Sequence, residues 1–156
     1  MFLARIDNRL IHGQIIETWL PYTGASTLVV ANDELSSDVL QQEIMALAIP
    51  GGVEANFTPV EEVAADMAAY QPPYDNSDTI ILFSTCADAL RAYKAGLAFA
   101  TLNLGNLHYS PGKKQICPHV ALSQEDEEIL SYFLSQGVKL DFRCVPTEAV
   151  QVRQTW

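Results

Sequence analysis

Short uncharged blocks rich in β-branched residues alternate with segments of helical spacing along most of this sequence. TLVVA (27–31) and TIILFS (79–84) carry no charge, which is typical of strands covered on both faces of a sheet. Between them, SSDVLQQEIMALAI (36–49) repeats apolar residues at helical intervals and stops at Pro50. Strands separated by helices predict a parallel sheet, because a parallel pair needs a crossover that a helix can supply.

The whole chain, residues 1–156, is read as a single α/β domain. We expect an open, mainly parallel sheet with helices on both faces and room for one antiparallel edge strand. Strands are predicted at 2–6, 27–31, 53–57, 79–84, 98–105 and 138–145. Helices are predicted at 13–20, 36–49, 59–70, 86–96 and 123–137, the first of them stopped by Pro21. The segment 106–119 is expected to be irregular.

The composition bears on which partners the protein can bind and on the compartment in which it is expected. The formal charge of −10 disfavours nucleic acid as a partner, because an acidic surface repels its phosphates. The apolar runs are too short to span a bilayer, and no basic stretch leads into an apolar one as in a secretory signal. The three cysteines are widely spaced and form no C-x-x-C pair, so we expect a reduced, cytoplasmic protein.

The decapeptide RIDNRLIHGQ (5–14) concentrates positive charge in this acidic chain, directly after the first predicted strand. It holds two of the nine lysines and arginines, together with one carboxylate, one histidine and one glycine. Ligands of open parallel sheets bind beyond the carboxyl ends of the strands, where this segment lies. Ser84-Thr85 and the 105–115 loop follow two other predicted strands. Three loops are therefore expected to meet at one edge of the sheet.

Familiar catalytic and cofactor patterns do not account for His12. The three histidines show no H-x-x-x-H or H-E-x-x-H spacing, so no metal is expected. A G-x-S-x-G elbow, a G-x-x-x-x-G-K-[ST] loop and a G-x-G-x-x-G turn are absent, so neither a serine hydrolase nor a nucleotide cofactor is expected. In a plainer alternative, Arg5 and Arg9 only pair with neighbouring carboxylates.

Phosphoryl transfer through imidazole is the chemistry that uses every part of this segment. A histidine side chain can attack phosphorus and form a covalent phosphohistidine. Arg5 and Arg9 match the geometry of phosphoryl oxygens, and Gly13 at a helix start leaves backbone N–H donors. Asp7 can orient the histidine or an arginine. We therefore hypothesise that His12 is a transient phosphoryl carrier.

RIDNRLIHGQ resembles the active-site signature of the IIB components of mannose-type (mannose/fructose/sorbose) sugar phosphotransferase systems. That signature is close to R-[IV]-D-[DN]-R-[LF]-[IL]-H-G-Q. Later segments are similar to the same family in order and spacing: TLVVANDELSSD, QEIMALAIPGGV, ILFSTCADALRAYKAG and LNLGNLHYSPGKKQICPHVALSQEDEE. The resemblance spans residues 2–145.

This resemblance implies an activity, partners and site residues. His12 would take a phosphoryl group, at Nδ1, from a phosphohistidine of a IIA protein and pass it to a sugar bound by the membrane IIC/IID complex. The catalytic residues would be His12, Arg9, Arg5 and Asp7, with Arg5 and Arg9 flanking the phosphoryl group. The phosphate-binding residues would be Arg9, Gly13, Gln14, Ser84 and Thr85. The family also implies a homodimer, and a peripheral position at the inner membrane face through IIC/IID.

Two positions depart from the family pattern, and two other functions stay open. Asn106 stands where a second glycine is common, and Asn8 stands where an acid is frequent. A regulatory phosphoprotein would keep the same loop but report its phosphorylation state without transporting a sugar. A small-anion binding module would use the loop without covalent chemistry.

Overall fold

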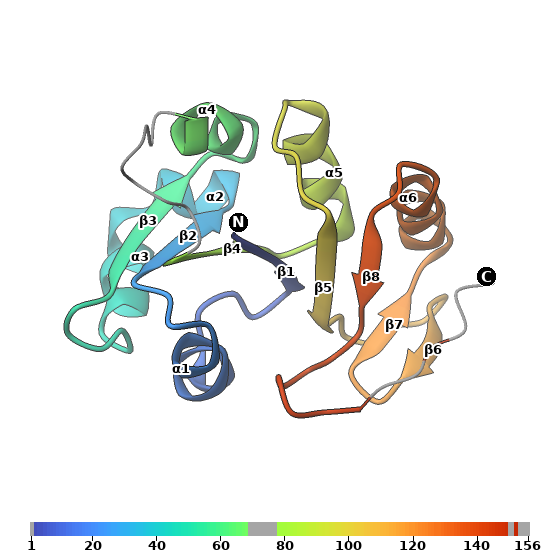
Figure 1. Ribbon diagram of the computed structural model, residues 1–156, viewed down its shortest axis with the longest axis horizontal. Coiled ribbons are helices and arrows are strands. Elements are labelled where there is room, and N and C mark those ends of the chain that lie inside the picture. The colour runs from blue at the N-terminus through green and yellow to red at the C-terminus, as the bar shows by residue number, and fades with distance from the viewer. Residues whose placement is uncertain (1, 69–77, 150–151, 153–156) are drawn as a thin grey trace.

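A six-stranded parallel sheet runs through the centre of the computed structural model, which describes residues 2–68, 78–149 and 152 (Figure 1). Its strands are β1 (Leu3–Asp7), β2 (Thr27–Ala31), β3 (Glu54–Thr58), β4 (Thr79–Phe83), β5 (Thr101–Asn106) and β8 (Lys139–Asp141). They are ordered β3-β2-β4-β1-β5-β8, and every adjacent pair is parallel. Because β1 lies between β4 and β5, the segment that follows it leaves the sheet near its centre.

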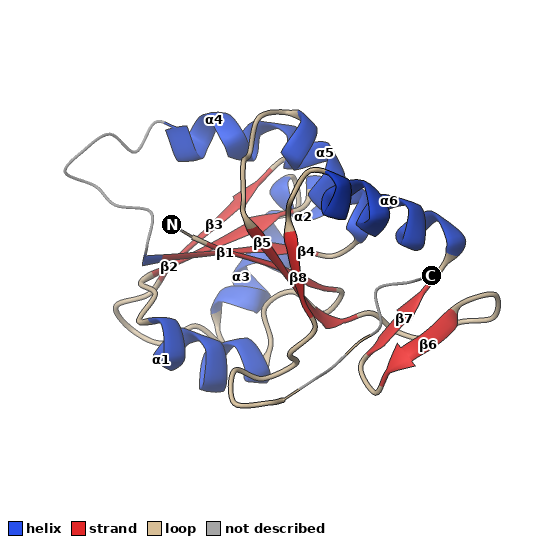
Figure 2. Cartoon of the chain, turned by 45° about the vertical axis from the view of Figure 1, so that its right-hand side comes forward, coloured by secondary structure: helices blue, strands red, loops and turns tan. Residues whose placement is uncertain are grey.

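Helices cover both faces of the sheet, as predicted. The helical segments are η1 (Ile15–Trp19, a π-helix), α1 (Leu20–Thr23), α2 (Asp33–Ser36), α3 (Val39–Ala46), η2 (Val60–Glu62, a 3-10 helix), α4 (Val63–Ala68), α5 (Cys86–Lys94) and α6 (Gln124–Ser135). With the sheet seen nearly edge-on, α4, α5 and α6 lie on one side and α1 and α3 on the other (Figure 2). A separate antiparallel pair is formed by β6 (Lys114–Cys117) and β7 (Val120–Leu122).

Alternate side chains of the strands enter two separate cores. In β4, Ile81 and Phe83 belong to the core beneath α4, α5 and α6, while Ile80 and Leu82 belong to the core beside η1 and α1. All four are fully buried, as expected of an uncharged strand with helices on both sides. On the second face, the central strands β1 and β5 carry buried polar side chains instead: Arg5, Asp7 and Asn103.

The first helix continues through Pro21, where the sequence predicted its end. The backbone widens into the π-helix η1, and the N–H of Leu20 donates to the carbonyl of Ile15. Pro21 then falls in the first turn of α1, where proline is tolerated because the N–H it lacks is not needed. The helix ends at Gly24, whose φ of 70° is left-handed.

Other predicted boundaries also change. The predicted helix 36–49 begins its longer part only after Asp38, whose side chain accepts the N–H of Gln41 and caps α3. The segment 106–119 was predicted to be irregular but contains β6, whose antiparallel partner is β7. The mainly parallel sheet is confirmed: both edges of the described six-stranded sheet are parallel, and the antiparallel pairing that the sequence left room for lies in the separate β6–β7 pair. Residues 69–70 of the predicted helix 59–70 lie outside the described residues.

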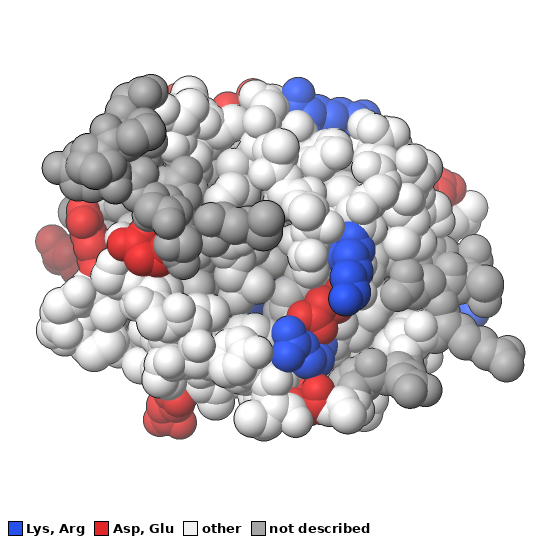
Figure 3. Space-filling view, viewed as in Figure 1, with Lys and Arg blue, Asp and Glu red and all other residues white. Residues whose placement is uncertain are grey.

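The described surface has one apolar helix and small groups of charge. α3 exposes Val39, Leu40 and Ile44, as does Leu47 directly after it, and the helix packs on the core through the partly buried Met45. On the face drawn in Figure 3, basic and acidic side chains of the described residues lie next to one another in a short row. No helix among the described residues has the length and apolar character needed to cross a membrane.

Candidate functional site

The turn that follows β1 sets the positions of the predicted site residues. The N–H of Leu10 donates to the carbonyl of Asp7 over 2.9 Å, and Oδ1 of Asp7 accepts the N–H of Arg9 over 3.1 Å. Leu10 has a φ of 58°, a left-handed conformation that costs an L-residue about 1–2 kcal/mol. This turn aims the carbonyl of Leu10 at Nδ1 of His12, which lies 2.8 Å away.

Asp7 is the centre of charge pairing in the site. Its side chain has no exposed surface, and its Oδ2 lies 3.0 Å from Nη2 of Arg5 and 3.0 Å from Nη2 of Arg9. Arg9 also donates its Nε–H to Oδ1 over 3.0 Å. Burial alone would raise the pKa of Asp7, but the hydrogen bonds from Arg9 and the charge of Arg5 together hold that pKa below its ordinary value. Asp7 is therefore an anion at neutral pH.

Arg5 lies wholly inside the protein and ties distant segments together. Its Nη1 donates to Oδ1 of Asn103 in β5 over 2.6 Å, and to the carbonyl of Arg143 over 3.3 Å. Its Nη2 donates to the carbonyl of Cys144 over 3.1 Å and to Asp7. Burial lowers the pKa of Arg5, and the neighbouring charge of Asp7 opposes that change. The guanidinium thus connects β1, β5 and the segment after β8.

Two neighbours define the space that Arg5 occupies. Trp19 of η1 has its ring centre 5.1 Å from Cζ of Arg5, and its Nε1–H donates to the carbonyl of Cys144 over 2.9 Å. Gly105 of β5 lies so close to the guanidinium that a Cβ at this position would overlap it. Residue 105 must therefore lack a side chain because of this close approach.

Gln14 joins both arginines to the segment after β8. Its Oε1 accepts hydrogen bonds from Nη2 of Arg5 (3.2 Å), Nη2 of Arg9 (2.9 Å) and Sγ of Cys144 (3.2 Å). Three donors around one oxygen fix the orientation of the amide, because the amide nitrogen cannot accept them. Among the described residues, the Nε2 of Gln14 has no hydrogen-bond partner, so its N–H groups remain as donors.

His12 lies at the rim of this cluster, with 16% of its side chain exposed. Its Nε2 is buried, is 3.5 Å from Oδ2 of Asp7 and has no hydrogen-bond partner in the part of the chain that the structure describes. A carbonyl can only accept, so the contact with Leu10 assigns a proton to Nδ1. One nitrogen is thus tied to the backbone, while the other faces a buried carboxylate.

The structure brings most of the predicted site residues into one connected cluster. Its members are Arg5, Asp7, Arg9, His12 and Gln14. Gly13 is exposed beside them. Arg5 does not lie where we expected it, because it is wholly buried and its Nη atoms already serve backbone and side-chain acceptors. Both arginines also pair with a neighbouring carboxylate, as the plainer alternative supposed.

The other two predicted loops reach the same edge in different ways. The third loop joins the first directly, because Asn8 N–H donates to the carbonyl of Asn106 and Asn106 Nδ2 donates to Oδ1 of Asn8. Ser84 is hydrogen-bonded to Asn32 and Asp88 instead. Thr85 caps α5 by accepting the N–H of Asp88 over 3.0 Å.

Sequence reasoning missed the residues that support the cluster from other strands. Asn103, a polar residue between Leu102 and Leu104 in a buried strand, was a signal that could have been used. Cys144 gave no such signal, since a cysteine in a predicted strand resembles ordinary core packing. Among the described residues, one group has side chains suited to a metal ion: His119, Cys144 and Glu148. These residues come from two segments far apart in the sequence, which a search for local histidine spacing does not join.

Comparison with known proteins gives the same family for sequence and structure. A family model described as "PTS system sorbose subfamily IIB component" matches residues 1–154. The sorbose-specific EIIB component of the Klebsiella pneumoniae PTS is 34% identical over 146 residues, which cover 94% of this chain and 88% of that protein. The mannose-specific EIIAB component of Escherichia coli (strain K12) is 31% identical over 147 residues, 94% of this chain but 45% of that protein.

A crystal structure of an N-acetylgalactosamine-specific IIB component 1 from Escherichia coli shares the fold. It matches with a TM-score of 0.85 and 30% sequence identity, and the match covers 99% of each chain. The mainly parallel sheet and the small antiparallel pair are therefore a shared architecture.

We expect Gly105→Ala to destabilise the protein by about 3–5 kcal/mol, the typical cost of breaking a buried ion pair by displacing one partner. The new Cβ would force Arg5 away from Asp7 and Asn103. Urea unfolding of the two proteins would measure the difference. Gly51→Ala is the matched control, since its Cβ meets no atom within 4 Å and should change stability by less than about 0.5 kcal/mol. Equal stability of both variants would contradict the close-approach argument.

We expect the stability lost in Asp7→Asn to depend on pH. The folded-state pKa of Asp7 lies below the ordinary 3.8, so its ionised form stabilises the fold above pH 3.8, and this contribution disappears as pH falls through the lower folded-state pKa. The free energies of unfolding of wild type and Asp7→Asn should therefore differ most near neutral pH and converge in acid. Urea titrations at a series of pH values would measure this, and a constant difference would count against it.

Proposed function

The chain belongs to the PTS sorbose subfamily of IIB components, and from that premise we propose that His12 carries a phosphoryl group from a IIA protein to a sugar. The sugar would be bound by membrane IIC/IID proteins, which would hold this domain at the inner face of the membrane. The mannose-specific EIIAB component of E. coli, whose name joins IIA and IIB, supports a IIA protein as the donor.

The observation that carries this proposal is the position of His12 against the cluster of Asp7, Arg9 and Gln14. A phosphoryl group on the ring would need cationic and N–H donors close by. Arg9 can supply them because 35% of its side chain is exposed, unlike Arg5. The free Nε2 of Gln14 and the backbone N–H groups of Gly13 and Gln14, at the start of the first helix, would add further donors.

Arg5 then has a positioning role rather than a contact with phosphate. Arg5 donates hydrogen bonds to Asp7 and Gln14 from inside the protein. The same two side chains accept hydrogen bonds from Arg9 and so fix its position. Ser84 and Thr85 remain proposed lining residues at the end of β4.

The transfer step can be written on the ring nitrogens. A lone pair of His12 forms a new N–P bond while the N–P bond of the donor phosphohistidine breaks, and the donor nitrogen keeps that electron pair. Nε2 is buried beside an anion, which favours Nδ1 as the acceptor. The ring must first turn away from the carbonyl of Leu10 and change tautomer: Nδ1 gives its proton to solvent, and Nε2 takes one from solvent and donates it as a hydrogen bond to Asp7. In the second transfer a sugar hydroxyl oxygen bonds to phosphorus while the N–P bond breaks, the His12 nitrogen keeps that electron pair, and the hydroxyl proton passes to solvent.

We expect the wild-type protein to gain one acid-labile, alkali-stable phosphate when incubated with phosphoenolpyruvate, the general phosphotransferase proteins and a mannose-type IIA. Intact mass would detect it, and His12→Ala should gain none. His108→Ala is the matched control, because it removes another histidine of the same edge and should still be phosphorylated. A folded wild-type protein that binds phosphate reversibly but retains none after denaturation would favour the anion-binding alternative. Retained phosphate without transfer to any sugar in IIC/IID membranes would favour the regulatory one.

We expect Arg9→Lys to slow phosphorylation of His12 by about 10²-fold, comparable to the loss of one positioned donor at a charged transition state. Lysine cannot pair bidentately with Asp7 and also present a second nitrogen to phosphate. Single-turnover transfer from phosphorylated IIA would give the rate, and thermal unfolding would check the fold. Arg91→Lys is the control, since Arg91 pairs on the surface with Asp33 and should keep the wild-type rate. An unchanged rate in Arg9→Lys would exclude its contact with the phosphoryl group.

A further inference from the structure

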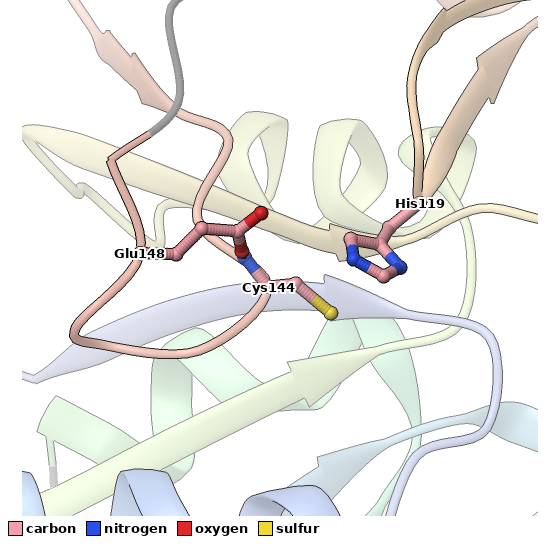
Figure 4. A group of neighbouring side chains, drawn as sticks. All are labelled: His119, Cys144 and Glu148. Carbon is pink, nitrogen blue, oxygen red and sulfur yellow. The ribbon is translucent and has the colours of Figure 1, made fainter.

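A cysteine, a histidine and a glutamate, none of which the proposed transfer uses as a phosphoryl contact, lie close together (Figure 4). His119 lies in the turn between β6 and β7, while Cys144 and Glu148 lie in the segment after β8. One ligand atom from each side chain lies within 4.8 Å of the other two. Figure 4 shows the sulfur of Cys144 turned toward the imidazole of His119.

The three side chains are held in different ways, and atoms that could ligate a metal ion remain without hydrogen-bond partners. Oε2 of Glu148 accepts the N–H of Cys144 over 2.8 Å and that of Val145 over 3.4 Å, which fixes its carboxylate. Its Oε1 and the ring nitrogens of His119 have no hydrogen-bond partner among the described residues. Cys144 is buried, whereas His119 is exposed, so the group opens to solvent on the His119 side.

We propose that His119, Cys144 and Glu148 form a binding site for a divalent transition-metal ion such as Zn²⁺. One thiolate, one imidazole and one carboxylate match the ligands of zinc, whereas Ca²⁺ and Mg²⁺ prefer oxygen alone. Three protein ligands leave a fourth position for water or an anion. In a tetrahedral zinc site the ligand atoms lie roughly 3.3–3.8 Å apart, so closing the site needs a movement of about 1 Å. Rotation of the exposed His119 side chain can supply it.

The site shares Cys144 with the cluster around His12. The thiol of Cys144 donates to Oε1 of Gln14 over 3.2 Å. A metal-bound thiolate has no proton to donate, so metal binding removes one of the three donors that orient Gln14. This coupling rests on the proposed function, because it matters only if Gln14 holds a phosphoryl group. The metal site itself does not depend on it.

Direct binding tests the metal site without any phosphoryl transfer. Tag-free, reduced protein is titrated with Zn²⁺ by calorimetry, and Co²⁺ is used as a spectroscopic probe of the sulfur–metal bond. We expect one site and a sulfur-to-cobalt charge-transfer band. Cys144→Ser, His119→Gln and Glu148→Gln should each weaken binding by about tenfold or more, and Cys144→Ser should remove the band. Glu148→Gln keeps an oxygen that can accept the two backbone N–H groups, so it tests the contribution of the negative charge to metal binding alone.

Cys117→Ser and His108→Gln are the matched controls, because they remove the same residue types outside the group and should bind Zn²⁺ as wild type does. Thermal unfolding without metal checks that each variant is folded. If Cys144→Ser fails this check, the exposed His119→Gln decides the result alone. Absence of one-site binding to wild type, or unchanged affinity in His119→Gln, would overturn the proposal.

Phosphorylation of His12 in the presence of Zn²⁺ then tests the coupling. We expect slower transfer in wild type and no effect of Zn²⁺ in His119→Gln. No transfer even without metal would count against the proposed function while leaving the titration result intact. Transfer that is unaffected at saturating Zn²⁺ would overturn the coupling alone.

Discussion

The buried ion pair between Arg5 and Asp7 is the interaction on which the rest of the site depends. Both side chains have no exposed surface, and two charges taken out of water are tolerated only when hydrogen bonds satisfy them. Here the acceptors come from β5, from Gln14 and from two carbonyls after β8. The requirements of one guanidinium thus determine where three other pieces of chain must lie. Arg9, at the surface, and the partly buried His12 are positioned by this arrangement.

The chain contains the same local turn twice, and the position of each turn in the sheet determines how deeply its aspartate is buried. In D-x-R after β1 and again after β8, the arginine N–H and Nε–H both donate to Oδ1 of the aspartate two residues before it. The first turn leaves the central strand β1, and Asp7 is fully buried. The second leaves the edge strand β8, and Asp141 keeps 15% exposure. The ring of Trp19 contacts the arginine of the second turn and the buried Arg5 that pairs with Asp7 of the first: its centre lies 5.6 Å from Cζ of Arg143 and 5.1 Å from that of Arg5.

The strands and the core of the site were predictable where the signal is local. Uncharged blocks located β2 and β4, and RIDNRLIHGQ placed Asp7, Arg9 and His12 together because they follow one predicted strand. The β6–β7 pair was missed because β6 carries exposed lysine and glutamine, and the buried apolar run of β7 is only three residues long. Pro21 led to a wrong prediction of the helix end, because the residue types before it give no sign of the π-helix that precedes it.

The support of the site was harder to predict, because it comes from contacts between residues far apart in the chain. Arg5 was expected beside phosphate but is buried, where it donates to the backbone carbonyls of residues 143 and 144. Because any residue offers a backbone carbonyl, the residue types at these two positions gave no signal. Ser84 lies at the expected edge, but Asn32 and Asp88 are its partners. The match to IIB components gives the family, while these individual roles rest on geometry.

The contact between Arg5 and the carbonyl of Arg143 joins residues 138 positions apart. During synthesis on the ribosome, the first strand therefore emerges long before the acceptors that complete the surroundings of its arginine. The strands that precede β8 can pair while the chain is still being elongated. The guanidinium of Arg5 lacks two of its acceptors, the carbonyls of residues 143 and 144, until these residues have left the exit tunnel. A chain released early would expose an unfinished His12 loop. The loop that carries His12 would therefore have all of its support only after residue 144 has been translated.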